Sequence, residues 1–232
     1  MESKKNIVLV HGAWADGSCW SKVIALLQQK GFNVSAAQLP LTSLDDDMTV
    51  TRNLLATQKG PTVLVGHSYG GVVITGAAND APNVSALVYI AAFGVDEGES
   101  IETLSKQGPP PPGAAQVRPD EHGFLWIDPA GFHQAFAADV DPVEARVMAV
   151  TQRPLSIRSF AAKSGPPAWK HIPSWYLVSK NDHMIPPPAE EFMAKRMGAT
   201  VRSIPASHAS MVSHPKDVFD LILLAAESET QK

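Results

Sequence analysis

The chain has 232 residues, and its 19 Lys and Arg against 23 Asp and Glu give a formal charge of −4. This balance argues against a nucleic-acid partner, because phosphate neutralisation needs an excess of positive charge. The single cysteine, Cys19, excludes an intrachain disulfide and indicates a reducing compartment. No apolar run approaches the ~18 residues of a membrane span or forms a signal peptide. The sequence therefore predicts a cytoplasmic protein with no membrane partner.

Short apolar runs alternate with amphipathic patterns, which predicts an α/β fold with a mostly parallel sheet of about six strands between helices. Strands are expected near residues 7–10, 32–36, 62–65, 86–90, 174–178 and 200–204. Helices are expected near residues 20–27, 45–59, 70–78, 188–197 and 215–225. The acidic triplet at 45–47 is interpreted as a solvated helix start, in preference to a metal site.

One connection is far longer than the sheet requires. About 80 residues separate Ala92 from Ser174, whereas a crossover between parallel strands needs only about 10–12. The segment is rich in proline and large apolar side chains, and its aromatic content argues against a disordered linker. We expect residues 1–95 and 171–232 to form the core, and residues 96–170 to form a small inserted helical cap.

The strongest local motif is Gly66-His67-Ser68-Tyr69-Gly70, between the strand at 62–65 and the helix at 70–78. It fits the pattern Gly-x-Ser-x-Gly, in which small neighbours allow a serine to occupy a strained strand-to-helix turn. The hydroxyl then stands above the carboxyl edge of the sheet, close to the N–H groups of the helix. Ser68 is the predicted nucleophile, and a tight turn that merely needs small residues is the alternative.

A serine hydroxyl needs a base, and the base needs an orienting acid. After a turn of this kind, the acid and then the base are expected on loops that follow later strands. Among eight histidines, His208 lies between the last predicted strand and the last predicted helix, so it is the predicted base. Asp182 follows the strand at 174–178 and is the predicted acid, although it could instead form an Asx turn. Asp96 and Glu97 are the alternative acids.

The backbone N–H groups of Ala13 and Tyr69 are predicted to stabilise an oxyanion, because one follows the first strand and the other follows the serine. Four aromatic side chains are candidates for lining a compact apolar pocket, although each could equally belong to the core: Trp14, Phe93, Trp126 and Phe132. No dinucleotide, phosphate-loop or zinc-protease motif is present, so we expect no cofactor and no metal.

Together, the segment 11–14, the motif 66–71 and the loops of Asp182 and His208 resemble the α/β-hydrolase superfamily. Within it, the chain is similar to the branch of plant hydroxynitrile lyases, methyl salicylate and methyl jasmonate esterases and their bacterial esterase relatives. The resemblance spans nearly the whole chain and implies an α/β-hydrolase fold in which Ser68, Asp182 and His208 form a triad.

Two departures separate the lyase and esterase branches. Hydroxynitrile lyases have a lysine directly after the catalytic histidine, whose ammonium stabilises the leaving cyanide, and here that position is Ala209. They also have a threonine where this chain has Gly12. Ester hydrolysis needs no cation there. We therefore predict a serine carboxylesterase for small, mainly apolar aryl or alkyl esters. Its expected partner is the small-molecule ester substrate, and the protein could also form a homodimer. A small-molecule binding protein with negligible turnover is the alternative, followed by a hydroxynitrile lyase.

Overall fold

The computed structural model describes residues 5–228. Six strands form one parallel sheet in the order β2-β1-β3-β4-β8-β9, which confirms the predicted sheet. The strands are β1 (Asn6–Val10), β2 (Asn33–Ala36), β3 (Thr62–His67), β4 (Val84–Ile90), β8 (Ser174–Ser179) and β9 (Thr200–Ile204). β1, β3 and β8 are buried along their whole length, because helices cover both faces of the sheet there, whereas the edge strands β2 and β9 have exposed positions.

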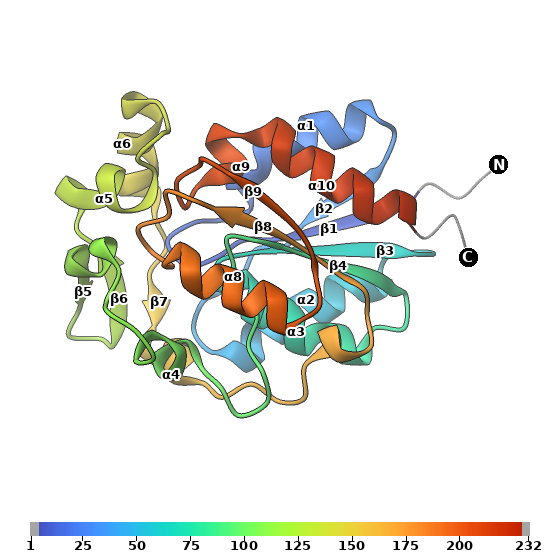
Figure 1. The fold of residues 1–232 in the computed structure, drawn as a ribbon, viewed down its shortest axis with the longest axis horizontal. Coiled ribbons are helices and arrows are strands. Elements are labelled where there is room, and N and C mark those ends of the chain that lie inside the picture. The colour runs from blue at the N-terminus through green and yellow to red at the C-terminus, as the bar shows by residue number, and fades with distance from the viewer. Residues whose placement is uncertain (1–4, 229–232) are drawn as a thin grey trace.

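The helices of the core cover the two faces of this sheet: α1 and α10 lie on one face, and α2, α3 and α8 lie on the other (Figure 1). The core helices are α1 (Ser21–Gln29), α2 (Leu44–Ala56), α3 (Gly70–Ala77), α8 (Pro187–Arg196), α9 (Ser210–Ser213) and α10 (Pro215–Glu227). In α10, Val218, Leu221 and Ile222 are fully buried, and this spacing directs one face of the helix at the core. Short 3₁₀ turns lie at Gly17–Trp20, Ala78–Asp80, Pro112–Gln116 and Ala168–Lys170.

Residues 96–170, which we call the cap, lie mainly beyond one end of the sheet (Figure 1). The cap contains four helices: α4 (Ile101–Ser105), α5 (Pro129–Phe136), α6 (Pro142–Thr151) and α7 (Ile157–Ala161). It also contains a three-stranded antiparallel sheet of β5 (Val117–Pro119), β6 (Phe124–Ile127) and β7 (Leu155–Ser156). The cap thus contains strands beside the expected helices, and the sequence analysis missed these strands because two to four residues are too few to show an alternating pattern. The boundaries of the cap stay a prediction.

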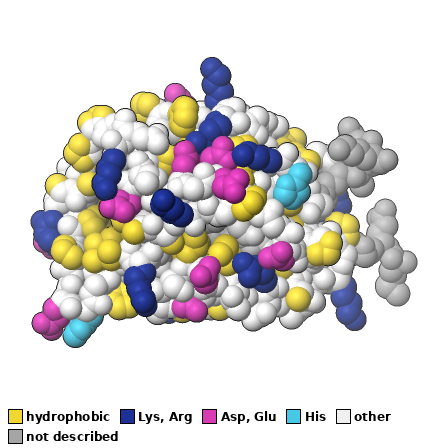
Figure 2. Space-filling model, turned by 90° about the horizontal axis from the view of Figure 1, so that it is seen from below, with side chains coloured by type: hydrophobic (Ala, Val, Ile, Leu, Met, Phe, Trp, Pro, Cys, Tyr) yellow, Lys and Arg dark blue, Asp and Glu magenta, His cyan; other side chains and the backbone are white. Residues whose placement is uncertain are grey.

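Hydrophobic side chains gather on part of the surface at the end of the molecule that carries the cap, and charged side chains are scattered over the whole of that face (Figure 2). None of the helices within residues 5–228 combines the length and the apolar character needed to span a lipid bilayer.

Candidate active site

Ser68 occupies the sharp turn between β3 and α3, where its backbone φ is 53°. This left-handed conformation is uncommon for a residue with a side chain, so the surrounding structure must hold it. Gly66 makes the close approach possible, because a Cβ there would lie 2.6 Å from the carbonyl oxygen of Gly70. Ser68 is only 4% exposed and lines a cavity. The predicted nucleophile thus stands in a strained turn beside an internal space.

Asp182 and His208 form a fully buried pair, in which Asp182 Oδ2 lies 2.5 Å from His208 Nδ1. The second carboxylate oxygen, Oδ1, accepts hydrogen bonds from the N–H groups of Met184 and Ile185 at 2.6 and 2.9 Å. The same carboxylate therefore closes its own turn and orients the imidazole. His208 Nε2 is buried and has no hydrogen-bond partner among residues 5–228, which leaves it available to act as a base.

His67 joins the serine turn to His208, a contact that the sequence analysis did not anticipate. The Nε2–H of His67 donates to the backbone carbonyl of His208 at 2.9 Å, and the two ring centroids are 4.7 Å apart. Burial, and then the neighbouring His208, lower the pKa of His67 well below its usual value, so this ring is neutral. Phe136 of the cap packs edge-on against His208, with ring centroids 4.9 Å apart. His208 is therefore enclosed by the core and the cap.

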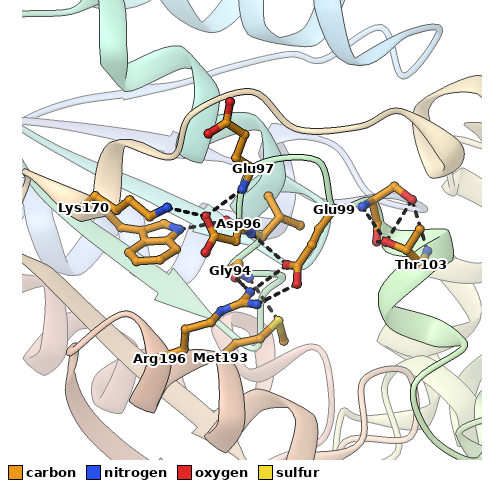
Figure 3. Close-up of polar contacts among 11 residues, drawn as sticks. Gly94, Asp96, Glu97, Glu99, Thr103, Lys170, Met193 and Arg196 are labelled. Carbon is orange, nitrogen blue, oxygen red and sulfur yellow. Dashed lines mark hydrogen bonds and ion pairs between the residues drawn. The ribbon is translucent and has the colours of Figure 1, made fainter.

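The alternative acids, Asp96 and Glu97, are the first two residues of the cap and follow the end of β4. Asp96 Oδ1 accepts hydrogen bonds from Lys170 Nζ at 2.6 Å and from the N–H of Glu97 at 2.7 Å (Figure 3). The side chain of Glu97 is exposed. No hydrogen bond or ion pair within residues 5–228 joins either carboxylate to His208, so the geometry favours Asp182.

The loop after β1 lies directly against Ser68. A Cβ on Gly12 would lie 2.7 Å from Ser68 Cβ and 2.9 Å from the carbonyl oxygen of His67. Ala13 and Tyr69, the predicted oxyanion donors, both line the cavity together with Ser68. The hydrogen bonds of residues 5–228 assign no acceptor to either backbone N–H, so both are free to meet a ligand.

The cavity has a volume of about 380 Å³ and lies between the edge of the sheet and the cap. Its wall is mostly apolar and includes no Lys, Arg, His, Asp or Glu side chain among the residues that the structure describes: Ala13, Trp14, Ser68, Tyr69, Phe93, Ile101, Ser105, Pro110, Pro111, Ala114, Val117, Leu125, Leu155, Phe160, Met184 and Ile185. Trp14 and Phe93 are thus in the wall, where the sequence analysis placed them. Trp14 Nε1 donates to the carbonyl of Leu125 at 2.8 Å, which ties the β1 loop to β6 of the cap.

Trp126 and Phe132 do not line this cavity, which corrects their expected position. Trp126 is 37% exposed, and its Nε1 donates to Asp120 Oδ2 at 2.8 Å on the surface of the cap. Phe132 is fully buried and packs against Phe136, with ring centroids 5.0 Å apart. Alternation along β6 turns Leu125 towards the cavity and Trp126 away from it, a distinction that needs the strand to be known first.

Asp47 was expected at a solvated helix start, but it is completely buried. Its Oδ2 accepts a hydrogen bond from the hydroxyl of Tyr69 at 2.5 Å, and its Oδ1 accepts one from the N–H of Leu41 at 2.8 Å. Burial raises the pKa of Asp47 to about 6, although these hydrogen bonds oppose the shift. The helical spacing of Leu44, Asp47 and Thr51 was a signal that Asp47 lies on the buried face.

A family model described as "Alpha/beta hydrolase family" matches residues 7–221. The chain belongs to this family. The match confirms the predicted superfamily, fold and hydrolase class, and it covers every residue of the candidate site.

Relatives of known sequence point to the same branch. The chain is 25% identical to a pyrethroid hydrolase of Sphingobium wenxiniae, over 97% of this chain and 89% of the relative. It is also 25% identical to methylesterase 2 of Arabidopsis thaliana, over 97% of each chain. The crystal structure of a pyrethroid hydrolase from Sphingobium faniae superposes with a TM-score of 0.85 at 25% identity, over 99% of this chain and 100% of that chain.

Proposed function

We propose that the protein is a serine carboxylesterase that hydrolyses small, mainly apolar aryl or alkyl esters. The observation that carries this proposal is the buried Asp182–His208 pair, which His67 joins to the strained turn of Ser68. Ser68 itself lines an apolar cavity. Nucleophilic acyl transfer requires a hydroxyl, a base to deprotonate it and an acid that orients the base. The esterase and hydrolase names of the relatives support the same reaction class.

In the proposed cycle, His208 Nε2 takes the hydroxyl proton of Ser68 while the serine oxygen attacks the carbonyl carbon of the ester. The N–H groups of Ala13 and Tyr69 stabilise the negative charge on the carbonyl oxygen. The bond to the alcohol oxygen then breaks, and the alcohol leaves with the proton from His208. Water attacks the acyl-enzyme and gives one proton to His208, which returns it to Ser68 as the acid departs.

The wall of the cavity supports the proposed substrate class. It has no charged side chain among residues 5–228, so a charged substrate would lose its hydration without gaining a counterion. A volume of about 380 Å³ lies at the small end of the range for ligand pockets, which suits a compact ester. The residue after His208 is the buried Ala209, so no ammonium stands where a departing cyanide would need it. This arrangement favours ester hydrolysis over the lyase reaction.

A fluorophosphonate probe with intact-mass analysis tests the nucleophile, and hydrolysis of p-nitrophenyl acetate and butyrate tests turnover. We expect one adduct on the native chain, none on Ser68→Ala, and loss of turnover in that variant. Ser203→Ala, which removes an exposed hydroxyl on the edge strand β9, is the matched control and should retain both. An adduct without turnover of any ester would instead support a binding protein, and cyanide release from mandelonitrile would support a lyase.

A further inference from the structure

Asp139 is a residue of the cap whose carboxylate binds the loop that carries His208. This loop spans residues 205–209, between β9 and α9, and we call it the base loop. Asp139 Oδ2 accepts a hydrogen bond from the backbone N–H of Ser207 at 3.0 Å, and Oδ1 accepts one from the Ser207 hydroxyl. Ser207 is only 2% exposed, so loss of the carboxylate would leave two buried donors without their acceptor.

The cap also binds the base loop on the other side of His208. The backbone N–H of Ala209 donates to the carbonyl of Phe136, the last residue of α5, at 3.1 Å. Asp139 follows Phe136 in the turn after α5, so one short stretch of the cap holds both neighbours of the predicted base. The carbonyl of His208 itself accepts the hydrogen bond from His67. The backbone is thus fixed at three consecutive residues.

Asp139 lies outside the cavity in which the ester would bind. It is absent from the described residues that line this cavity, and so is His214, whose Nδ1 lies 3.3 Å from Asp139 Oδ2 at the start of α10. Both of these side chains are partly exposed to solvent. Any effect of Asp139 on turnover must therefore act through the groups that it contacts.

The backbone of the base loop decides where the imidazole of His208 lies. The bond from Asp182 to Nδ1 sets the rotation of the ring, but the ring as a whole follows the Cα atom that carries it. A general base works when its nitrogen comes within about 3 Å of the proton donor, here the hydroxyl of Ser68. A displacement of about 1 Å can cost 10²-fold in rate, so the base loop must be held closely.

We propose that Asp139 is a positioning residue for His208. Its carboxylate binds Ser207 and so holds the base loop where Nε2 of the imidazole can serve the hydroxyl of Ser68. This inference rests on the proposed function, because that function makes His208 the base. Asp139 touches neither the substrate nor the reacting atoms, and it exchanges no proton during the cycle.

Asp139→Ala and Asp141→Ala form a matched pair of substitutions in the connection between α5 and α6. Asp141 caps α6 by accepting hydrogen bonds from the N–H groups of Val143 and Glu144 at 2.9 and 3.2 Å. In Asp139→Ala we expect kcat to fall about tenfold with KM unchanged, since hydrogen bonds to a charged group are lost. Asp141→Ala should lower the urea midpoint through loss of the cap of α6, but keep the native kcat.

Two further variants assign the effect to Ser207. Ser207→Ala removes the hydroxyl and keeps the backbone donor, so kcat should fall by a smaller factor, about threefold. The double variant of Asp139→Ala and Ser207→Ala should be no slower than Asp139→Ala alone, because the acceptor of that hydroxyl is already absent. Asp139→Asn keeps an acceptor oxygen for the backbone N–H and an amide for the hydroxyl, so it should restore most of kcat.

The following kinetic results would overturn the proposal. A native kcat in Asp139→Ala would show that the base loop needs no support from this carboxylate. An equal loss in Asp141→Ala would trace the effect to general loosening of the cap. Losses that multiply in the double variant would mean that Asp139 does not act through Ser207. If Asp139→Ala does not fold, a native kcat in Ser207→Ala would overturn the proposal by itself.

Proton NMR tests the position of the base without any need for activity. The Nδ1–H of His208, bonded to Asp182, should give a strongly downfield resonance in the native protein and in Asp141→Ala. This resonance should shift or weaken in Asp139→Ala, and an unchanged resonance there would overturn the proposal. If the native protein neither reacts with the fluorophosphonate nor hydrolyses an ester, the proposed function fails, and the resonance still shows whether Asp139 holds the base loop.

Discussion

The Nε2–H of His67 donates to the backbone carbonyl of His208 at 2.9 Å, so the residue before the predicted nucleophile holds the residue predicted to be its base. This contact joins two segments that are distant in the sequence, the end of β3 and the loop after β9. The alignment of the site therefore depends on a neutral imidazole as well as on Asp182.

Replacement of His67 by Phe tests this contact. Phe keeps a ring in the same packing but leaves the buried carbonyl of His208 without a donor, so the free energy of unfolding should fall by about 1–3 kcal/mol. Urea denaturation measures the change. His122→Phe removes a solvent-exposed imidazole and should leave stability nearly unaltered. Equal denaturation midpoints for His67→Phe and the native protein would contradict the role of this hydrogen bond.

Substitution of Gly12 tests the close approach of the β1 loop to the serine turn. In Gly12→Ala, the new methyl group would lie 2.7 Å from Ser68 Cβ, so the turn must move. We expect a loss of about 1–3 kcal/mol in unfolding free energy from overpacking, together with a large fall in kcat/KM. Gly108→Ala is the control, because a Cβ there meets nothing within 4 Å. Native activity in Gly12→Ala would show that the loop yields without disturbing Ser68.

The raised pKa of Asp47 predicts that the free energy of unfolding depends on pH. Its folded-state pKa of about 6 lies above the ordinary value of 3.8, so the folded protein binds the proton more tightly than the unfolded chain does. The contribution of this bound proton to the free energy of unfolding is fully present below pH 3.8 and is lost as the pH rises through 6. Asp47→Asn should therefore gain stability relative to the native protein between pH 4 and pH 7, by at most about 3 kcal/mol.

Urea denaturation of both proteins across this pH range measures that difference. Asp45→Asn removes an exposed charge from the same helix start, which separates the loss of a helix-terminal charge from the loss of the buried carboxylate. A difference between Asp47→Asn and the native protein that does not change with pH would rule out titration of Asp47 in this window.

Arg196 and Glu99 connect α8 to the entry of the cap. Arg196 Nη1 and Nη2 bind the two carboxylate oxygens of Glu99 at 2.7 and 2.8 Å, and Nη2 also donates to the carbonyl of Gly94 at 2.6 Å (Figure 3). Both side chains are about one-fifth exposed. A double-mutant cycle of Glu99→Gln and Arg196→Met should give a coupling energy of about 1–3 kcal/mol in urea denaturation.

The exposed pair of Lys106 and Glu102 provides the comparison for this cycle. Its partners lie one helical turn apart and are largely hydrated, so its coupling should not exceed about 0.5 kcal/mol. Equal coupling energies for the two pairs would mean that the bidentate contact contributes nothing beyond an ordinary surface ion pair.

Much of the core could be predicted because each of its elements has a local signature. The runs at 62–65 and 174–178 are apolar at nearly every position, as strands buried on both faces must be, and they lie within β3 and β8. The strained turn at Ser68 could be located because glycines flank it between a predicted strand and a predicted helix, whereas the role of Ser68 as nucleophile stays a prediction. The positions of Asp182 and His208 then followed from the order of strands and loops.

The buried polar groups could not be predicted in the same way. Asp47 and Tyr69 meet only because α2 and α3 pack together, and Glu190 reaches the N–H of Ser179 only because α8 folds back along β8. Helical spacing indicates which residues face inwards, but it does not identify the polar group that each will meet. The strands of the cap could not be predicted from the sequence, because β7 has only two residues and β5 ends in Pro119.

The uncharged wall of the cavity has a consequence for the end of the proposed reaction. Hydrolysis converts a neutral ester into an alcohol and an anionic acid at neutral pH, and the cavity wall supplies no cation within residues 5–228 to retain that anion. The newly formed acid regains its hydration only by leaving. Product inhibition by the released acid should accordingly be weak, and turnover should continue while the acid accumulates in solution.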